Sequence, residues 1–165
     1  MNRRHFLSFS AGSVALAGCS TIGIDINNPL DPVRSDVDLI VHAFNGLMSQ
    51  LATVHGMTPE MMSTITTAVN DLQTIGTQLK SVNTLNDAQP YIQRIESDIN
   101  SIVGVLAKLQ QIPQSVSIII QAANTLLPVI ENAVGIVVSP KVALRASAGR
   151  MTTEQARNVL RSASK

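Results

Sequence analysis

The sequence predicts an all-α protein, an antiparallel up-and-down bundle of about four helices with a short C-terminal helical extension. Apolar residues recur at intervals of three and four along four segments between residues 35 and 138. The connections between these segments are short, at about four residues each, which places successive helices antiparallel. We expect an aliphatic core, because the chain has no Trp, one Tyr and three Phe.

The first helix is expected to begin at Ser35 and to end before Gly56. Ser35 can cap the helix, and Asp38, three residues later, completes a pattern like a capping box. The apolar face consists of Val37, Ile40, Val41, Phe44, Leu47, Met48, Leu51 and Val54. We therefore assign residues 35–140 to the bundle and residues 19–34 to a tether that precedes it.

The second helix has a strong start signal. Thr58 is a suitable N-cap, Pro59 suits the first helical position, and Glu60 places an acid in the first turn. Apolar residues recur at helical spacing as far as Val82, and residues 83–86 then break the pattern.

The third helix shows a heptad-like pattern. Asn86 or Asp87 is expected to cap it, and its apolar face runs through Ile92, Ile95, Ile99, Ile102, Val103, Leu106 and Leu109. Spacings that alternate between three and four are typical of helices that pack as in a coiled coil. Pro113 interrupts the pattern, and the alternative is one long bent helix from Asp87 to Val138.

The fourth helix, opened by Ser115, is long and rich in Ile and Val. Polar residues also recur at helical spacing on the opposite side, namely Gln121, Asn124, Thr125, Glu131 and Asn132, with Pro128 and Gly135 beside them. Because a membrane span is apolar on all sides, we expect an amphipathic core helix that is kinked at Pro128. The alternative is a membrane-active or pore-forming protein that uses residues 115–138.

The C-terminal residues 141–165 form a basic tail on an acidic body. They carry a net charge of +5, whereas residues 19–140 carry −6. Thr152 and Gln155 form a capping box, and Arg157, Arg161 and Lys165 follow at a spacing of four. The apolar face from Ala156 to Ala163 looks too short to dock firmly. We expect a mobile, solvated helix that contacts an anionic surface, a lipid or an acidic partner, through its three basic residues.

The N-terminus has the layout of an export signal. Arg3 and Arg4 precede a modest apolar run from Phe6 to Ala17, about twelve residues long. A spanning helix needs about twenty residues. Residues 1–18 are therefore expected to be a signal peptide rather than a permanent membrane span.

The export motif resembles the twin-arginine signal, Ser/Thr-Arg-Arg-x-Phe-Leu-Lys. Arg3, Arg4, Phe6 and Leu7 match it, whereas Asn2 and Ser8 depart from it. The resemblance implies export by the route that carries folded proteins, and ordinary general secretion is the alternative.

The sequence Leu16-Ala17-Gly18-Cys19 resembles a bacterial lipobox at every position. The resemblance implies lipid attachment to Cys19, the single cysteine of the chain, and cleavage before it. Ser20 follows, where Gram-negative lipoproteins retained in the inner membrane tend to have Asp. In such a cell this favours the outer membrane, facing the periplasm.

No pattern in the sequence indicates a catalytic, metal or cofactor site. His42 and His55 are thirteen residues apart and form no ligand pair, and no nucleotide-binding loop is present. The scarcity of aromatic residues disfavours nucleic-acid binding. We therefore expect a lipid-anchored envelope protein with a structural or adaptor role, acting through a protein partner or self-association of helix faces, and not an enzyme. The second alternative, besides the membrane-active one, is a cofactor-carrying exported protein.

Overall fold

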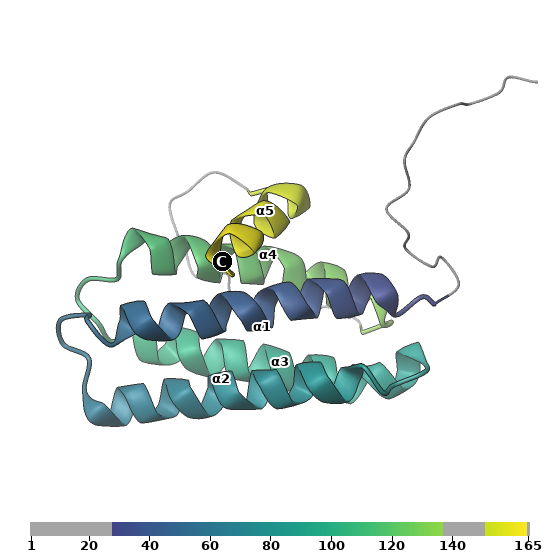
Figure 1. Ribbon diagram of the computed structural model, residues 1–165, viewed down its shortest axis with the longest axis horizontal. Helices are drawn as coiled ribbons and strands as arrows, with labels where there is room; N and C mark the ends of the chain where they lie inside the picture. The colour runs from purple at the N-terminus through teal and green to yellow at the C-terminus, as the bar shows by residue number, and fades with distance from the viewer. Residues whose placement is uncertain (1–27, 137–150, 165) are drawn as a thin grey trace, which may run out of the picture.

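The computed structural model describes residues 28–136 and 151–164, and within them every regular element is a helix (Figure 1). The elements are α1 (Asp31–Leu51), α2 (Pro59–Leu79), α3 (Leu85–Leu106), α4 (Gln114–Ala133) and α5 (Thr153–Ala163). The prediction of an all-α bundle is confirmed. Residues 87–133 form two helices rather than one bent helix, because residues 107–113 separate α3 from α4.

The first four helices form a closed ring. Successive helices run in opposite directions (Figure 1), and contacts join α1 to α2, α2 to α3, α3 to α4 and α4 back to α1. The fifth helix lies over α1 and α4, and it contacts both. Each helix of the ring thus buries its apolar face against two neighbours.

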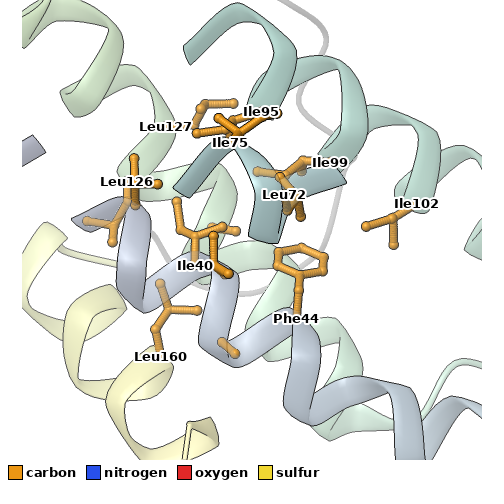
Figure 2. Close-up of a cluster of buried hydrophobic side chains, with 14 of the residues drawn as sticks. Ile40, Phe44, Leu72, Ile75, Ile95, Ile99, Ile102, Leu126, Leu127 and Leu160 are labelled. Carbon is orange, nitrogen blue, oxygen red and sulfur yellow. The ribbon is translucent and has the colours of Figure 1, made fainter. Parts of the chain in front are cut away.

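The core is aliphatic, as expected. Figure 2 shows part of the cluster, in which side chains from α1, α2, α3, α4 and α5 come together. The heptad-like positions of α3 are confirmed as core, since Ile92, Ile95, Ile99 and Ile102 are all 0% exposed. Such interiors are close-packed, so the shape of each aliphatic side chain matters.

The start of α2 is as predicted, whereas α1 and α3 begin earlier than predicted. The Thr58 hydroxyl accepts a hydrogen bond from the Met61 amide at 3.2 Å. The N-cap of α3 is Thr84, whose hydroxyl accepts from the Asp87 amide at 3.2 Å, rather than Asn86 or Asp87. Thr84 is suited to this role because it precedes the helix with an extended backbone and a short side-chain acceptor.

The first helix begins at Asp31 rather than Ser35 and ends at Leu51, well before Gly56. Leu30 is 0% exposed, so residues 30–34 belong to the bundle and not to the predicted tether. Gly56 lies in the following loop with a φ of 86°, a conformation that glycine adopts without strain.

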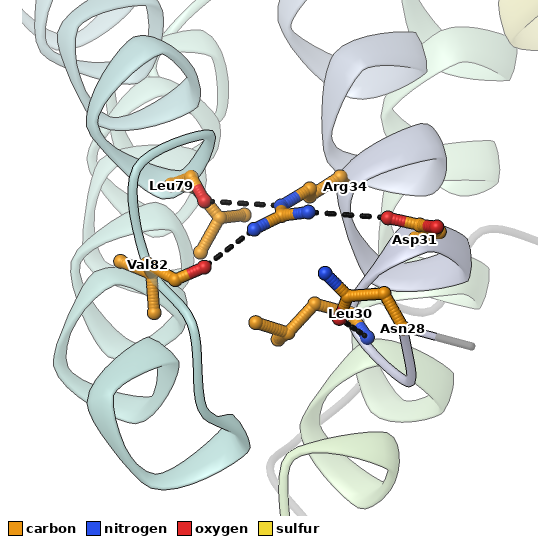
Figure 3. Close-up of polar contacts among 6 residues, drawn as sticks. All are labelled: Asn28, Leu30, Asp31, Arg34, Leu79 and Val82. Atoms are coloured by element: carbon orange, nitrogen blue, oxygen red, sulfur yellow. Dashed lines mark hydrogen bonds and ion pairs between the residues drawn. The ribbon is translucent and has the colours of Figure 1, made fainter. Parts of the chain in front are cut away.

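Arg34 explains why the bundle extends to these residues (Figure 3). Its guanidinium donates to the carbonyl oxygens of Leu79 and Val82 and to the carboxylate of Asp31. The last carbonyls of a helix lack partners within the helix, and a cation there also opposes the helix dipole. Arg34 therefore caps the end of α2, whose own last turn contains no basic residue, and ties α1 to it.

The fourth helix packs on three sides, against α1, α3 and α5. Its buried face is wider than predicted, because it includes Glu131, which is 6% exposed and which the sequence placed on the polar side. The helix continues through Pro128. Within the described residues, α4 alone is long and apolar enough to cross a membrane, and 44% of that window is buried inside the protein.

The expectation that the C-terminal helix is too short to dock is wrong for residues 153–163. Ala156 and Leu160 of α5 are 0% exposed, and Leu160 points into the cluster toward Ile40 (Figure 2). The predicted capping box is present, since Thr152 accepts from the Gln155 amide and Gln155 accepts from the Thr152 amide. The spacing of apolar residues within α5 indicates how long its apolar face is. It does not show how closely that face packs against α1 and α4.

The backbone of α5 approaches α1 closely at Gly46. A Cβ atom at this position would lie 2.7 Å from the carbonyl oxygen of Ala163, which is nearer than real Cβ contacts allow. Gly104 in α3 differs, because a Cβ there would meet nothing within 4 Å. Both glycines lie inside helices, where glycine costs about 0.5–1 kcal/mol relative to alanine.

These two glycines give a matched test of α5 docking. We expect Gly104→Ala to raise the free energy of unfolding by about 0.5–1 kcal/mol through helix propensity alone. We expect Gly46→Ala to lower it by roughly 1 kcal/mol, because the added methyl displaces the end of α5. Urea unfolding followed by circular dichroism measures both, and an equal gain in the two variants would contradict the docked position of α5.

Candidate functional site

The residues of the predicted export motif and lipobox lie outside the described residues. They are Arg3, Arg4, Phe6, Leu7, Leu16, Ala17, Gly18 and Cys19. Of the three basic residues proposed to contact an anionic surface, Arg157 and Arg161 are described and Lys165 is not.

Arg157 is bound within the protein by Asp36 of α1. Its Nε and Nη2 atoms donate to the two carboxylate oxygens of Asp36, each at 2.7 Å. The Asp36 side chain is 6% exposed and that of Arg157 is 34% exposed. The hydrogen bond to Asp36 raises the pKa of Arg157 against the opposing effect of burial. Arg157 is therefore a bidentate partner for a buried carboxylate, and the prediction of a mobile cation at this position is wrong.

Sequence reasoning missed Asp36, although the chain holds a signal for it. Asp36 lies in the apolar stripe of α1, three residues after Val33 and four before Ile40, and both neighbours are buried. An acid in the middle of a buried stripe needs a partner, because an unpaired buried charge is costly. The sequence could have flagged that need, but it could not have said which of the basic residues meets it.

A shallow groove between α1 and α5 brings His42 and Arg161 to one surface. Its lining residues are Ser35, Asp38, Leu39, His42, Arg161 and Ser164. The His42 ring nitrogen Nδ1 lies 2.6 Å from the backbone oxygen of Asp38, while Arg161 donates to the Asn158 side chain at 3.0 Å. The groove thus combines two basic groups, an acid and two hydroxyls at an exposed position.

A second shallow groove follows the contact between α2 and α3. It is lined mostly by hydroxyl and amide side chains, with two acids, and its residues are Ser63, Thr64, Thr67, Ala68, Asn70, Asp71, Thr74, Asp98 and Ser101. The hydroxyls of Thr67 and Thr74 donate to the backbone one turn earlier, at 3.0 Å in each case. These two hydroxyls therefore make hydrogen bonds within α2, and they also line the groove.

The two acids of this groove have different environments. Arg94 of α3 donates to both oxygens of Asp71, at 2.6 and 2.9 Å. Asp98 Oδ2 is buried with no hydrogen-bond partner. Burial, followed by the negative charge of Asp71, raises the pKa of Asp98 to about 6, against the opposing charge of Arg94. A protonated Asp98 can share its proton with Asp71, whereas an ionised Asp98 places two carboxylates side by side.

The described residues contain no group of three or more His, Cys, Asp or Glu side chains placed to hold a metal ion. His55 is exposed in the loop after α1. No protein-family model, curated protein or solved structure matches the chain. The features that bear on function are thus the N-terminal motifs, the closed bundle with its docked α5, and the two polar grooves.

The acid pair makes the stability of the protein depend on pH. The folded-state pKa of Asp98, about 6, lies above its ordinary value of 3.8, so the folded state holds this proton more tightly than the unfolded state. The resulting stabilisation is complete below the ordinary pKa and is lost as the pH rises through about 6. We expect Asp98→Asn to raise the free energy of unfolding at pH 7 and to flatten its slope between about pH 4 and 6.

The measurement is urea unfolding at several pH values. The control is Asp87→Asn, an exposed acid about three turns earlier in the same helix, which should leave the slope in place. A slope unchanged by Asp98→Asn would show that this carboxyl is not the group responsible.

Proposed function

We propose that this protein is a lipoprotein of the bacterial cell envelope, anchored through Cys19, with a structural or adaptor role. The observation that carries the proposal is the complete Leu16–Cys19 lipobox behind a twin-arginine-like signal. A single lipid chain anchors a protein only marginally, and two or more hold it stably. Ser20 after the lipidated cysteine favours the outer membrane, facing the periplasm, in a Gram-negative cell.

The position of the bundle supports an anchored role. Asn28 is the ninth residue after Cys19, so the intervening chain reaches about 30 Å at most. The end of the bundle where α1 begins also holds the turn between α2 and α3 and the end of α4 (Figure 1). Arg34 and the Gln89 side chain, which donates to Val134 O at 2.8 Å, tie these parts together. Under the proposed anchor, this end is the one joined to the lipid by the shortest stretch of chain, and the loops at 52–58 and 107–113 lie at the other end of the bundle.

Lipid attachment is tested by Cys19→Ser. We expect the variant to lose incorporation of labelled palmitate and cleavage before residue 19, because no other cysteine is present to take the lipid. Mass spectrometry of the mature N-terminus and fractionation of cell envelopes measure these outcomes. Palmitate label retained in the variant would overturn the proposal.

The export route is tested by replacing Arg3 and Arg4 with lysine. General secretion needs only positive charge and tolerates this change, whereas the twin-arginine route is expected to be blocked. The readout is the amount of processed protein in the envelope. Unchanged export would remove the twin-arginine route and leave the lipid anchor as proposed.

The second candidate function is membrane insertion of α4, which its length and hydropathy favour. Its packing against α1, α3 and α5 supports a core helix instead. We expect the chain from Ser20 to Lys165, which lacks the signal and Cys19, to stay in the soluble fraction without detergent. Recovery of this chain only in detergent, in a folded state, would favour the membrane-active candidate.

A further inference from the structure

Arg94 of α3 serves two carboxylates, one on the neighbouring helix and one on its own. It donates to both oxygens of Asp71, at 2.6 and 2.9 Å, and so bridges α3 to α2. Asp98 lies four residues after Arg94 in α3, a spacing at which side chains are neighbours on the surface of a helix. The charge of Arg94 also acts on Asp98, because it lowers the pKa of that carboxyl against the effects of burial and of Asp71. Two acids therefore compete for one guanidinium.

Asp98 is the acid of this pair that lacks a donor. Its Oδ2 atom is buried with no hydrogen-bond partner, whereas both oxygens of Asp71 accept from Arg94. An ionised carboxylate can only accept hydrogen bonds, so this position favours the protonated form, in which Asp98 donates to Asp71. In that form α3 holds Asp71 from two positions, one turn apart.

Loss of the proton reverses the contribution of Asp98 to the contact between the helices. An ionised Asp98 repels Asp71 and keeps a buried oxygen without a donor. Arg94 can supply that donor along its own helix, without reaching across to α2. The side chains of Arg94 and Asp71 are 50% and 33% exposed, and exposed ion pairs are weak, so little opposes the change of partner.

The other charged residues of the packed helices lie away from this acid pair. In α2, the remaining charge is Glu60 in the first turn, eleven residues or about 16 Å before Asp71. In α3, Glu96 lines a different groove. In α4, the one charge is Glu131, at the end that lies beside the start of α3. Apart from Asp71 and Asp98, the groove is lined by uncharged residues, namely Ser63, Thr64, Thr67, Ala68, Asn70, Thr74 and Ser101.

We propose that Arg94 is a proton-controlled switch at the contact between α2 and α3. When Asp98 carries its proton, Arg94 binds Asp71 and joins the two helices. When Asp98 is ionised, Arg94 pairs with it within α3, and Asp71 presents a released carboxylate to the hydroxyl-lined groove. Burial and then the charge of Asp71 raise the pKa of Asp98 to about 6, so the bridge to α2 is present at lower pH and is lost as the pH rises through about 6.

The direct test observes the partner of Arg94 by nuclear magnetic resonance at pH 5 and pH 8, on either side of about 6. The sample is the mature chain, residues 19–165, with Cys19→Ser. We expect nuclear Overhauser contacts between the side chains of Arg94 and Asp71 at pH 5 and their loss at pH 8. The midpoint of that loss should coincide with the titration of the Asp98 carboxyl carbon. Contacts to Asp71 that persist at pH 8 would overturn the proposal.

Two controls separate the switch from a general effect of pH. In Asp98→Asn, the side chain at this position cannot ionise, so Arg94 should stay on Asp71 at both pH values. The Asp36–Arg157 pair, which has no second acid competing for its guanidinium among the printed contacts of the pair, should keep its contacts at both pH values. Loss of the Arg94 contact at pH 8 in Asp98→Asn as well would also contradict the proposal.

A double-mutant cycle measures the same change as an energy of interaction. The cycle combines Asp71→Asn with Arg94→Gln at pH 8, where every carboxyl is ionised, and urea unfolding gives the equilibrium constants. With Asp98 present, the coupling factor between the two positions should be near one. In the Asp98→Asn background it should be about two- to fivefold, as for other exposed ion pairs. Equal coupling in the two backgrounds would show that Arg94 does not change partner.

Discussion

The buried carboxylate of Asp36 is the constraint on which the arrangement of the outer helices depends. An acid within the apolar face of α1 must find a cation with the right geometry, because removing one partner of a buried pair is strongly destabilising. Arg157 meets the requirement with two parallel hydrogen bonds. The pair joins α5 to α1, and α5 in turn covers part of α4, the most apolar of the described helices. The ion pair, the buried Leu160 and the close approach at Gly46 together hold α5 over this surface.

Asp36 and Asp98 illustrate opposite outcomes of burial for a carboxylate. Asp36 is satisfied by a guanidinium that approaches both of its oxygens. Asp98 shares its cation with Asp71, and the shared charge does not offset burial, so the pKa of Asp98 rises to about 6. The first arrangement joins helices that are far apart in the sequence, whereas the second makes the α2–α3 contact sensitive to pH near neutrality.

The proposed anchor at Cys19 leads into a four-helix ring whose helices contact one another in a closed order. Arg34 holds the end of α2 to the start of α1, at the end of the ring where the described chain begins. The structural or adaptor role remains our proposal, and the shallow polar grooves of the described residues are the surfaces at which a partner would be sought.

The sequence by itself determined the class of fold, the apolar faces and several helix starts. The cap at Thr58, the capping box at Thr152 and the heptad positions of α3 depend on residues within a few turns of one another, so local spacing reveals them. It also holds the motifs at Arg3, Arg4 and Cys19, which lie outside the described structure. Only the tertiary structure decided where α5 lies, because Asp36 and Arg157 are 121 residues apart. Only the tertiary structure likewise revealed the roles of Gly46 and Arg34, because each contacts the backbone of another helix. The spacing of residues within one helix does not encode the shape of its neighbour.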